Sequence, residues 1–375
     1  MGARATFLLL AAALASGCAT TSPSRGTVPL SVRVKPAPVP TAAGTMIDYE
    51  LAVGRYAALG LEPSRVDVRK GSASGEVLRT YEGTDLGRYL VPPPEGWPDV
   101  AVLLVGLTLP EGVPAPAELH HAITFADGSV ASGGVATVST TAPVAILPPV
   151  KGERWWMANG PTTLPIYHRN ARIPAGAVDY YSERFAIDFL QLGKDGLPFS
   201  GDGSKNADWY CYGAELLAVA DGTIVDARDG VPENAPMAGR AVPMTMQNIG
   251  GNSIVLDVGD RHDRFAFYAH AIPGSLTVKI GDKVKAGQVL GKLGNSGNSD
   301  APHLHFHVCD GVGPLGTANE SLYCDGLPYV VPSYVLLGTT GSEFMVDRRP
   351  WTPSGAPQFR TNELPLMDQV VSFER

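Results

Sequence analysis

Residues 302–308 read PHLHFHV, so that histidine alternates with an apolar residue along the stretch. In a β-strand successive side chains point to opposite faces, which places His303, His305 and His307 together on one face. Neutral imidazole is the commonest metal ligand in proteins and also serves as a general base. Three adjacent histidines without partners would pack a core poorly. The stretch therefore predicts a β-strand with one face for chemistry and the other for packing.

The segments around this strand also have the pattern of strands joined by turns. Residues 215–225 read ELLAVADGTIV, which predicts a strand, an Asp-Gly turn and a second strand, and residues 253–258 and 264–270 form the arms of another predicted hairpin. The chain has 44% hydrophobic residues with 43 Gly and 32 Pro, which suits short strands better than long helices. We therefore predict an all-β protein in which residues 154–341 form a mainly antiparallel β-sheet core.

A second folded unit is expected before this core, because 375 residues exceed the usual size of one domain. Short apolar alternations separated by turn signals recur across residues 46–145, a spacing that predicts an immunoglobulin-like β-sandwich. The Pro-rich stretch 141–151 marks the boundary, and we expect the two units to fold separately. Residues 342–375 are expected to form a C-terminal tail.

The first residues have the composition of an export signal. Arg4 supplies positive charge, an apolar run covers residues 7–15, and Ala-Ser-Gly-Cys follows. The predicted signal peptide is residues 1–17, and its end resembles a bacterial lipobox, in which Cys18 becomes the lipidated first residue. Residues 18–45, rich in Thr, Ser, Pro and Ala, would then be a tether to a membrane anchor. Ordinary cleavage at small residues would instead release a soluble secreted protein, and both alternatives export the chain.

The residue after the cysteine is Ala19 rather than Asp. In a double-membraned bacterium this resembles an outer-membrane sorting signal. The predicted location is therefore an exported lipoprotein that faces the periplasm or cell wall, anchored in the outer membrane.

Export also permits disulfides. A bridge between Cys309 and Cys324 would close a loop of about 15 residues and contribute on the order of 3 kcal/mol, although pairing of Cys211 with either cysteine stays open. The formal net charge is −8, with 29 basic and 37 acidic residues. No run of Lys or Arg would neutralise successive phosphates, so nucleic acid is not an expected partner.

Several blocks, in order along the chain, resemble the lysostaphin-like, LytM-type zinc metallopeptidases that cleave peptidoglycan cross-links. They cover about a third of the chain. The resemblance implies a zinc endopeptidase of peptidoglycan peptides, with residues 154–341 as its metallopeptidase core. The blocks are FAIDF at 185–189, LAVADGTIV at 217–225, GNSIVLD at 251–257, FYAH at 267–270, VKIGDKVKAGQVLG at 278–291, GNSGNS at 294–299 and PHLHF at 302–306.

The resemblance also implies roles for single residues. Asp188 matches the family's carboxylate ligand of zinc and His305 its HxH ligand, while His303 and His270 match two catalytic histidines that do not bind the metal. Zinc would lower the pKa of a bound water towards about 7, and the two imidazoles would take its proton and stabilise the oxyanion. The family's first ligand, a His four residues before the Asp, is replaced by Arg184, whose protonated guanidinium cannot bind zinc.

A third protein ligand must therefore come from elsewhere in the sequence. Our candidate is His168, which an inserted loop would bring beside Asp188. The second candidate is His307, which shares a strand face with His305. Alternate side chains on one strand lie about 6 to 7 Å apart, which makes joint binding of one ion by these two histidines awkward.

Two other interpretations fit parts of the same blocks. Residues 278–291 also resemble the hammerhead of lipoyl or biotinyl carriers, but no modifiable Lys occupies the expected hairpin and the histidine strand has no role there. The other alternative is a catalytically inactive LytM-type domain that binds and regulates a cell-wall hydrolase. Such domains usually lose several active-site positions. Retention of Asp188, His270, His303 and His305 favours the enzyme.

Overall fold

The protein is described by a computed structural model. The predicted signal peptide, residues 1–17, and Cys18 lie outside the described residues. Within the described part of the chain, no helix is both long and apolar enough to cross a membrane. The described residues are 27–93, 95–96, 99–175, 178–311, 324–340, 349–353 and 355–373.

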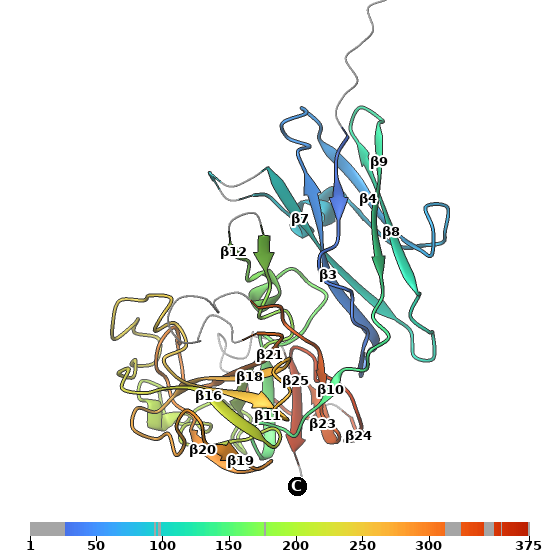
Figure 1. Cartoon of the computed structure of the whole chain (residues 1–375). Helices are drawn as coiled ribbons and strands as arrows, with labels where there is room; N and C mark the ends of the chain where they lie inside the picture. The colour runs from blue at the N-terminus through green and yellow to red at the C-terminus, as the bar shows by residue number, and fades with distance from the viewer. Residues whose placement is uncertain are drawn as a thin grey trace, which may run out of the picture.

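The N-terminal unit consists of two antiparallel sheets that enclose a shared apolar core (Figure 1). β8 alternates buried and more exposed residues, as expected for a strand with one face on a core. One sheet has the order β1-β3-β7-β6, with β2 paired to β3; the other has the order β5-β4-β8-β9. The strands are β1 (Leu30–Ser31), β2 (Val39–Thr41), β3 (Gly44–Gly54), β4 (Pro63–Lys70), β5 (Val77–Glu82), β6 (Leu90–Val91), β7 (Val100–Leu109), β8 (Glu118–Phe125) and β9 (Val130–Thr137).

These strands confirm the all-β prediction for this unit, while its immunoglobulin-like plan stays a prediction. The strands begin earlier than expected, because β1 and β2 lie within residues 18–45, the predicted tether. One short helix, α1 (Gly83–Tyr89), connects β5 to β6 and buries Leu86 and Tyr89. The unit is therefore a β-sandwich whose first strands come from the Pro-rich N-terminal segment.

The second unit is built on a ten-stranded sheet with the order β19-β16-β17-β18-β21-β14-β11-β25-β23-β24. All its pairings are antiparallel, which confirms the predicted β-sheet core. Its strands are β11 (Gly152–Ala158), β14 (Ile187–Gln191), β16 (Gly222–Arg228), β17 (Asn252–Val258), β18 (Phe265–Ala271), β19 (Lys283–Val284), β21 (Leu304–Cys309), β23 (Tyr334–Thr339), β24 (Gln358–Arg360) and β25 (Gln369–Phe373).

Smaller elements surround this sheet. The pairs β12–β13 and β15–β20 are antiparallel, whereas β10 and β22 run parallel. Two single-turn 3-10 helices lie in the connections. The bounds are β10 (Val144–Ala145), η1 (Tyr167–Asn170), β12 (Ile173–Ala175), β13 (Val178–Tyr180), η2 (Asn206–Asp208), β15 (Glu215–Leu217), β20 (Val289–Lys292) and β22 (Tyr329–Val330).

The described part of the predicted C-terminal tail, residues 342–375, is built into the large sheet. β25 lies between β11 and β23 and pairs with both. Val370 and Val371 are fully buried in the core of the second unit. The prediction of a C-terminal tail is therefore corrected. A strand that is buried on both faces appears in the sequence only as a run of apolar residues, and β25 is too short for such a run to indicate a strand.

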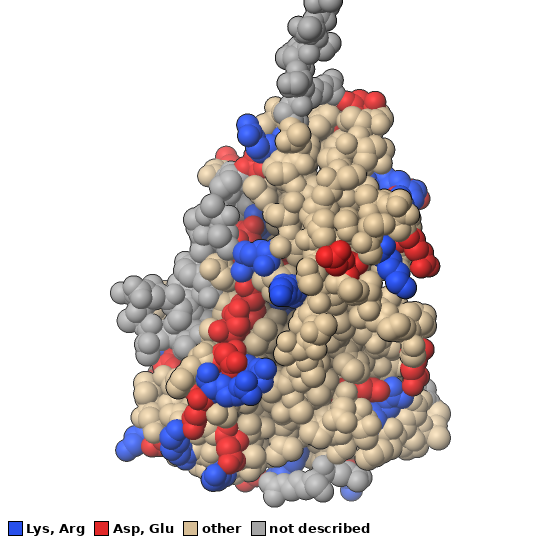
Figure 2. Space-filling model, turned by 45° about the vertical axis from the view of Figure 1, so that its right-hand side comes forward, with Lys and Arg blue, Asp and Glu red and all other residues tan. Residues whose placement is uncertain are grey.

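The two units share an apolar interface. Val39 and Met46 of the sandwich pack in the core cluster of the second unit, and Val102 and Leu104 of β7 pack against Tyr181. The continuous apolar sequence of β7 follows from this position, because one face of the strand points into the sandwich and the other towards the second unit. On the face drawn in Figure 2, acidic and basic side chains are interspersed among uncharged ones.

Candidate metal centre and active site

The histidine strand predicted from the sequence is β21, which lies near the middle of the large sheet. It pairs with β14 on one side and with β18 on the other. Leu304, Phe306 and Val308 are fully buried in the core of the unit. His305 and His307 therefore lie on the opposite face of the strand. The register places His305 directly opposite Asp188 of β14.

The structure brings three predicted metal ligands together. Asp188 Oδ1 lies 3.0 Å from His305 Nδ1 and 3.5 Å from His168 Nε2. One ligand atom from each residue lies within 4.8 Å of the others, which is the arrangement of side chains that could hold one metal ion. His168 reaches this place from η1, a 3-10 turn in the connection between β11 and β12, rather than from a strand of the large sheet.

Asn159 orients two of these three side chains. The Nδ1–H of His168 donates to the Asn159 carbonyl at 2.9 Å, which leaves the His168 Nε2 lone pair free for a metal. The Asn159 side-chain amide donates to Asp188 Oδ2 at 2.7 Å and leaves Oδ1 towards the site. Ligand-orienting hydrogen bonds of this kind are typical of metal sites.

The donor set fits zinc. Two imidazoles and one carboxylate form a known catalytic zinc set, which leaves a fourth position for water. Burial raises the pKa of Asp188, but the electrostatic effects of His168 and His303 and the hydrogen bond from His305 outweigh burial and hold this pKa well below its usual value. Asp188 is therefore an ionised, buried carboxylate that needs a cation as partner.

The two predicted catalytic histidines lie beside this triad. His303 Nε2 is 3.5 Å from Asp188 Oδ1, and the rings of His303 and His270 are 4.7 Å apart. His303 Nδ1 donates to the Ala301 carbonyl, and His270 Nδ1 donates to the Ser296 carbonyl, each at 2.8 Å. Both Nε2 atoms therefore carry lone pairs. Burial is the main cause that lowers the pKa of both residues, so both imidazoles are neutral at neutral pH.

The backbone of β18 aims His270 at the site. Strict alternation would put His270 with Ala266 and Tyr268, which face the hydrophobic core. His270 instead has a left-handed φ of 69°, and the register between β17 and β18 shifts at this end. The irregularity turns His270 to the same side as Ala269, and both residues line the cleft.

His307 and Arg184 do not join the triad. His307 Nδ1 lies 3.0 Å from His305 Nε2, so His307 contacts the ring of His305 on the side away from Asp188. Arg184 is buried against Glu50 of the sandwich and the Gly326 carbonyl. His307 as third ligand is thus not supported, whereas its contact would hold the His305 ring in place.

The predicted bridge between Cys309 and Cys324 is present, with Cα atoms 5.9 Å apart, and Cys211 is a buried free thiol. These two cysteines lie near His307 in a second grouping of potential ligands. Their sulfurs are joined to each other and are not thiolates. The grouping therefore lacks the thiolates that bind zinc.

The site opens into a cleft of about 880 Å³. Trp156, Tyr167 and Met246 supply apolar walls, and Arg240 and Asp300 supply charges at its edge. A partly apolar cleft with a few polar groups is the usual form of a ligand-binding site. Two residues near the triad were not predicted from the sequence. One is Asn159. The other is Glu183, whose Oε1 lies 3.8 Å from His305 Nε2; a single Asn or Glu in a loop carries no spacing signal.

Part of the chain is similar to a known peptidase family. Residues 207–315 match the model of peptidase family M23, a range that includes His270, His303 and His305 but begins after His168 and Asp188. Residues 207–315 of the chain are therefore similar to peptidase family M23.

Individual relatives are similar over short stretches. The glycyl-glycine endopeptidase ALE-1 of Staphylococcus capitis is 44% identical over 78 residues, which are 20% of this chain and 21% of that protein. Lysostaphin of Staphylococcus simulans is also 44% identical over 78 residues, 20% of this chain and 15% of that protein. The solved catalytic domain of lysostaphin is 24% identical, covers 43% of this chain and 84% of that chain, and has a TM-score of 0.24. The chain thus spans about a fifth of the relatives it matches.

Proposed function

We propose that the protein is a zinc-dependent endopeptidase that hydrolyses peptide cross-links of bacterial peptidoglycan. The observation that carries this proposal is the convergence of His168, Asp188 and His305 beside two neutral histidines in one cleft. Similarity to a glycyl-glycine endopeptidase and to lysostaphin supports the choice of peptide substrate.

In this proposal His168 Nε2, Asp188 Oδ1 and His305 Nδ1 hold the zinc. Bound zinc supplies Lewis-acid polarisation of a carbonyl and a water whose pKa is lowered to about 7. Asp188 contributes the negative charge, and the Asn159 amide keeps its second oxygen occupied. The His168 ring is held by the Asn159 carbonyl, so its free nitrogen faces the site.

His303 and His270 would perform the proton transfers. His303 Nε2 carries a lone pair 3.5 Å from Asp188 Oδ1 and would accept the proton of the attacking water. His270 would stabilise the negative charge that develops on the carbonyl oxygen once its Nε2 has taken up a proton, because its Nδ1–H is already donated to the Ser296 carbonyl. Their lowered pKa values keep both rings able to accept a proton at neutral pH.

The predicted export signal would place this activity outside the cytoplasm, where peptidoglycan lies. Lipidation of Cys18 would hold the enzyme at a membrane that faces the cell wall, with the outer membrane as the expected one. Substitution of Cys18 by Ala should then release the protein from the membrane fraction. Unchanged membrane association and processing would refute the anchor.

The test of the function compares metal content with hydrolysis of purified peptidoglycan. His168→Ala and His305→Ala should lose zinc, whereas His303→Ala and His270→Ala should keep zinc and lose turnover. His120→Ala, on β8 of the sandwich, is the matched control and should change neither quantity.

The outcomes separate the alternatives. If the parent protein binds zinc and His168→Ala binds it equally well, the ligand assignment is wrong. If the parent protein binds no zinc and does not hydrolyse peptidoglycan, the proposed endopeptidase activity is refuted. The alternative, a LytM-type domain that regulates a cell-wall hydrolase, then replaces it.

A further inference from the structure

The outer faces of β3 and β7 are covered by the second unit. Asp48 and Glu50 point outward from β3, where the inward side chains of the same strand fill the sandwich core. Asp48 pairs in register with Gly106 of β7, and Glu50 pairs with Leu104. Acidic side chains on an otherwise apolar, buried sheet face are costly unless cations meet them.

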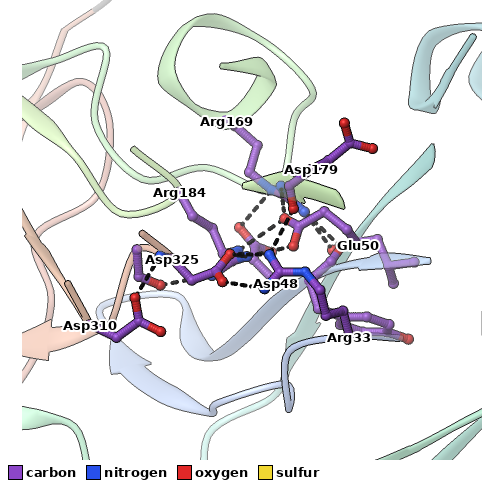
Figure 3. Close-up of polar contacts among 11 residues, drawn as sticks. Arg33, Asp48, Glu50, Arg169, Asp179, Arg184, Asp310 and Asp325 are labelled. Carbon is purple, nitrogen blue, oxygen red and sulfur yellow. Dashed lines mark hydrogen bonds and ion pairs between the residues drawn. The ribbon is translucent and has the colours of Figure 1, made fainter. Parts of the chain in front are cut away.

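Two arginines from the second unit meet Glu50 (Figure 3). Arg169 Nη1 donates to Glu50 Oε1 at 2.7 Å, and Arg184 donates to both carboxylate oxygens, from Nε at 2.9 Å and from Nη2 at 2.5 Å. The side chains of Arg169 and Arg184 are only 2% and 3% exposed. Glu50 is thus the shared anion of two buried cations across the interface.

Arg169 is also bound to the backbone of the sandwich. Its Nη2 donates to the Tyr49 carbonyl at 2.9 Å and to the Val105 carbonyl at 3.2 Å. A guanidinium that is fixed by a carboxylate and two carbonyls has a defined position, because its donors form a rigid fork. The residue that precedes Arg169 in the chain is His168.

The segment that carries His168, residues 159–171, has few means of its own to hold a fixed shape. Its regular structure is the single 3-10 turn η1, and Tyr167 within that turn has a left-handed φ of 48°. Such a short turn is not stable alone. Packing against other parts of the protein must therefore fix the direction of His168.

A second contact between the sandwich and this segment is steric. A Cβ atom added to Gly106 of β7 would lie 2.7 Å from both the Cβ and the carbonyl oxygen of Thr163. Glycine at this position therefore permits close approach of the segment to the outer face of the sandwich. Just beyond the segment, Arg172 donates to the Pro92 carbonyl of the sandwich at 3.2 Å.

From these contacts we infer that the β-sandwich is part of the metal centre: Glu50 positions the zinc ligand His168 through Arg169, and Gly106 admits the segment that carries it. This inference rests on the proposed zinc site. Arg184, at the position where the resemblance places a zinc ligand, is the second cation on Glu50. The same carboxylate thus binds Arg184 and Arg169, the neighbour of His168 in the chain.

The test uses the full chain with two substitutions that act by different routes. Glu50→Gln keeps the size of the side chain and removes the negative charge that Arg169 binds. Gly106→Ala leaves every charge in place and displaces Thr163. Arg33→Met is the matched control, because Arg33 spans the same interface but binds Asp325 and the Asp179 carbonyl.

Two quantities are measured on each protein. The first is the Kd for zinc, by competition with a chromophoric chelator at a temperature where thermal unfolding shows the protein folded. Loss of an outer contact of a metal ligand typically weakens metal binding about 10- to 100-fold, and we expect this range for Glu50→Gln and Gly106→Ala but no change for Arg33→Met. The second is amide hydrogen exchange of residues 159–171 in the metal-free protein, which should accelerate in the same two variants while exchange in β14 and β21 stays as in the parent.

Zinc affinity and exchange equal to the parent in both folded variants would overturn the inference. If one variant fails to fold, the other decides. If the parent binds no zinc, the proposed function fails, and exchange alone then decides whether the sandwich fixes the His168 segment: faster exchange supports that part, and unchanged exchange refutes it.

Discussion

Asn159 is the residue whose substitution most directly tests how the metal centre is oriented. Its side-chain amide donates the 2.7 Å hydrogen bond to Asp188 Oδ2, and its backbone has a left-handed φ of 47°. Alanine would add backbone strain of about 1 to 2 kcal/mol at such a φ. An alanine variant would therefore combine this strain with the loss of the hydrogen bond. Glycine adopts this φ without strain, so Asn159→Gly removes the amide and leaves the backbone path open.

The size of the effect follows from the kind of hydrogen bond that is lost. A hydrogen bond to a charged group contributes about 1.5 to 3 kcal/mol, and each 1.4 kcal/mol corresponds to about a tenfold change in an equilibrium constant. Without the amide, Asp188 is free to rotate its carboxylate away from His168 and His305. We therefore expect Asn159→Gly to weaken zinc binding by about 10- to 100-fold.

The assay is chelator competition at equilibrium, with circular dichroism to confirm the fold. Asn170→Gly is the matched control: it places the same flexible residue in the same segment, at an exposed position, and keeps the amide at Asp188. The reasoning is refuted if Asn159→Gly binds zinc within twofold of the parent, or if Asn170→Gly weakens binding equally.

Two further predictions concern the catalytic pair and the interface. Gly251→Ala should lower turnover and keep zinc, because the new Cβ would lie 2.5 Å from the carbonyl oxygen of Ser296, the acceptor that fixes His270; metal content and hydrolysis rate check this. Burial raises the pKa of Asp48 to about 7, against a partly opposing charge from Arg169. The folded state thus keeps a proton that the unfolded state releases, so this contribution to stability is present below the ordinary aspartate pKa of 3.8 and is lost as pH rises through 7. Asp48→Asn should therefore gain stability relative to the parent between pH 5 and pH 8, by up to a few kcal/mol; equal pH dependence of the two unfolding free energies would contradict it.

The sequence predicted the parts of the fold that depend on local pattern. Alternation of histidine and apolar residues identified β21, and the Asp-Gly pair marked the start of β16. The strand before that pair was wrong in its extent and partner, because β15 ends at Leu217 and pairs with β20 rather than with β16. The sequence did not predict β25, because a five-residue apolar strand near the end of a chain looks like any short apolar run. The interface was also not predicted. Met46 and Glu50 alternate with the core residues of β3, a pattern that normally indicates an outer face in water.

The sequence likewise predicted the parts of the candidate site that follow from local pattern, but not those that depend on contacts between distant segments. Asp188, His270, His303 and His305 were predicted because matched blocks keep their order, and each lines the cleft. His168 was the first candidate for the ligand that Arg184 cannot supply, and its approach to Asp188 and His305 depends on contacts that only the folded chain creates. The expectation that the two units fold separately conflicts with those contacts. We now expect a chain that begins near residue 150 to bind zinc poorly.

Restoring the family's ligand at Arg184 should not compensate for the loss of His168. Glu183 lines the cleft, whereas the Arg184 side chain points away from it, to Glu50 and to the Gly326 carbonyl, which accepts from Nη1 at 2.7 Å. A histidine at this position would leave that carbonyl without its donor and Glu50 with a single arginine, which costs several kcal/mol for a buried charge network. We therefore expect His168→Ala/Arg184→His to bind no more zinc than His168→Ala and to unfold at a lower temperature. Recovery of zinc in the double variant would show that the backbone at residue 184 can still turn a side chain into the site, and that the sandwich is then dispensable for the metal.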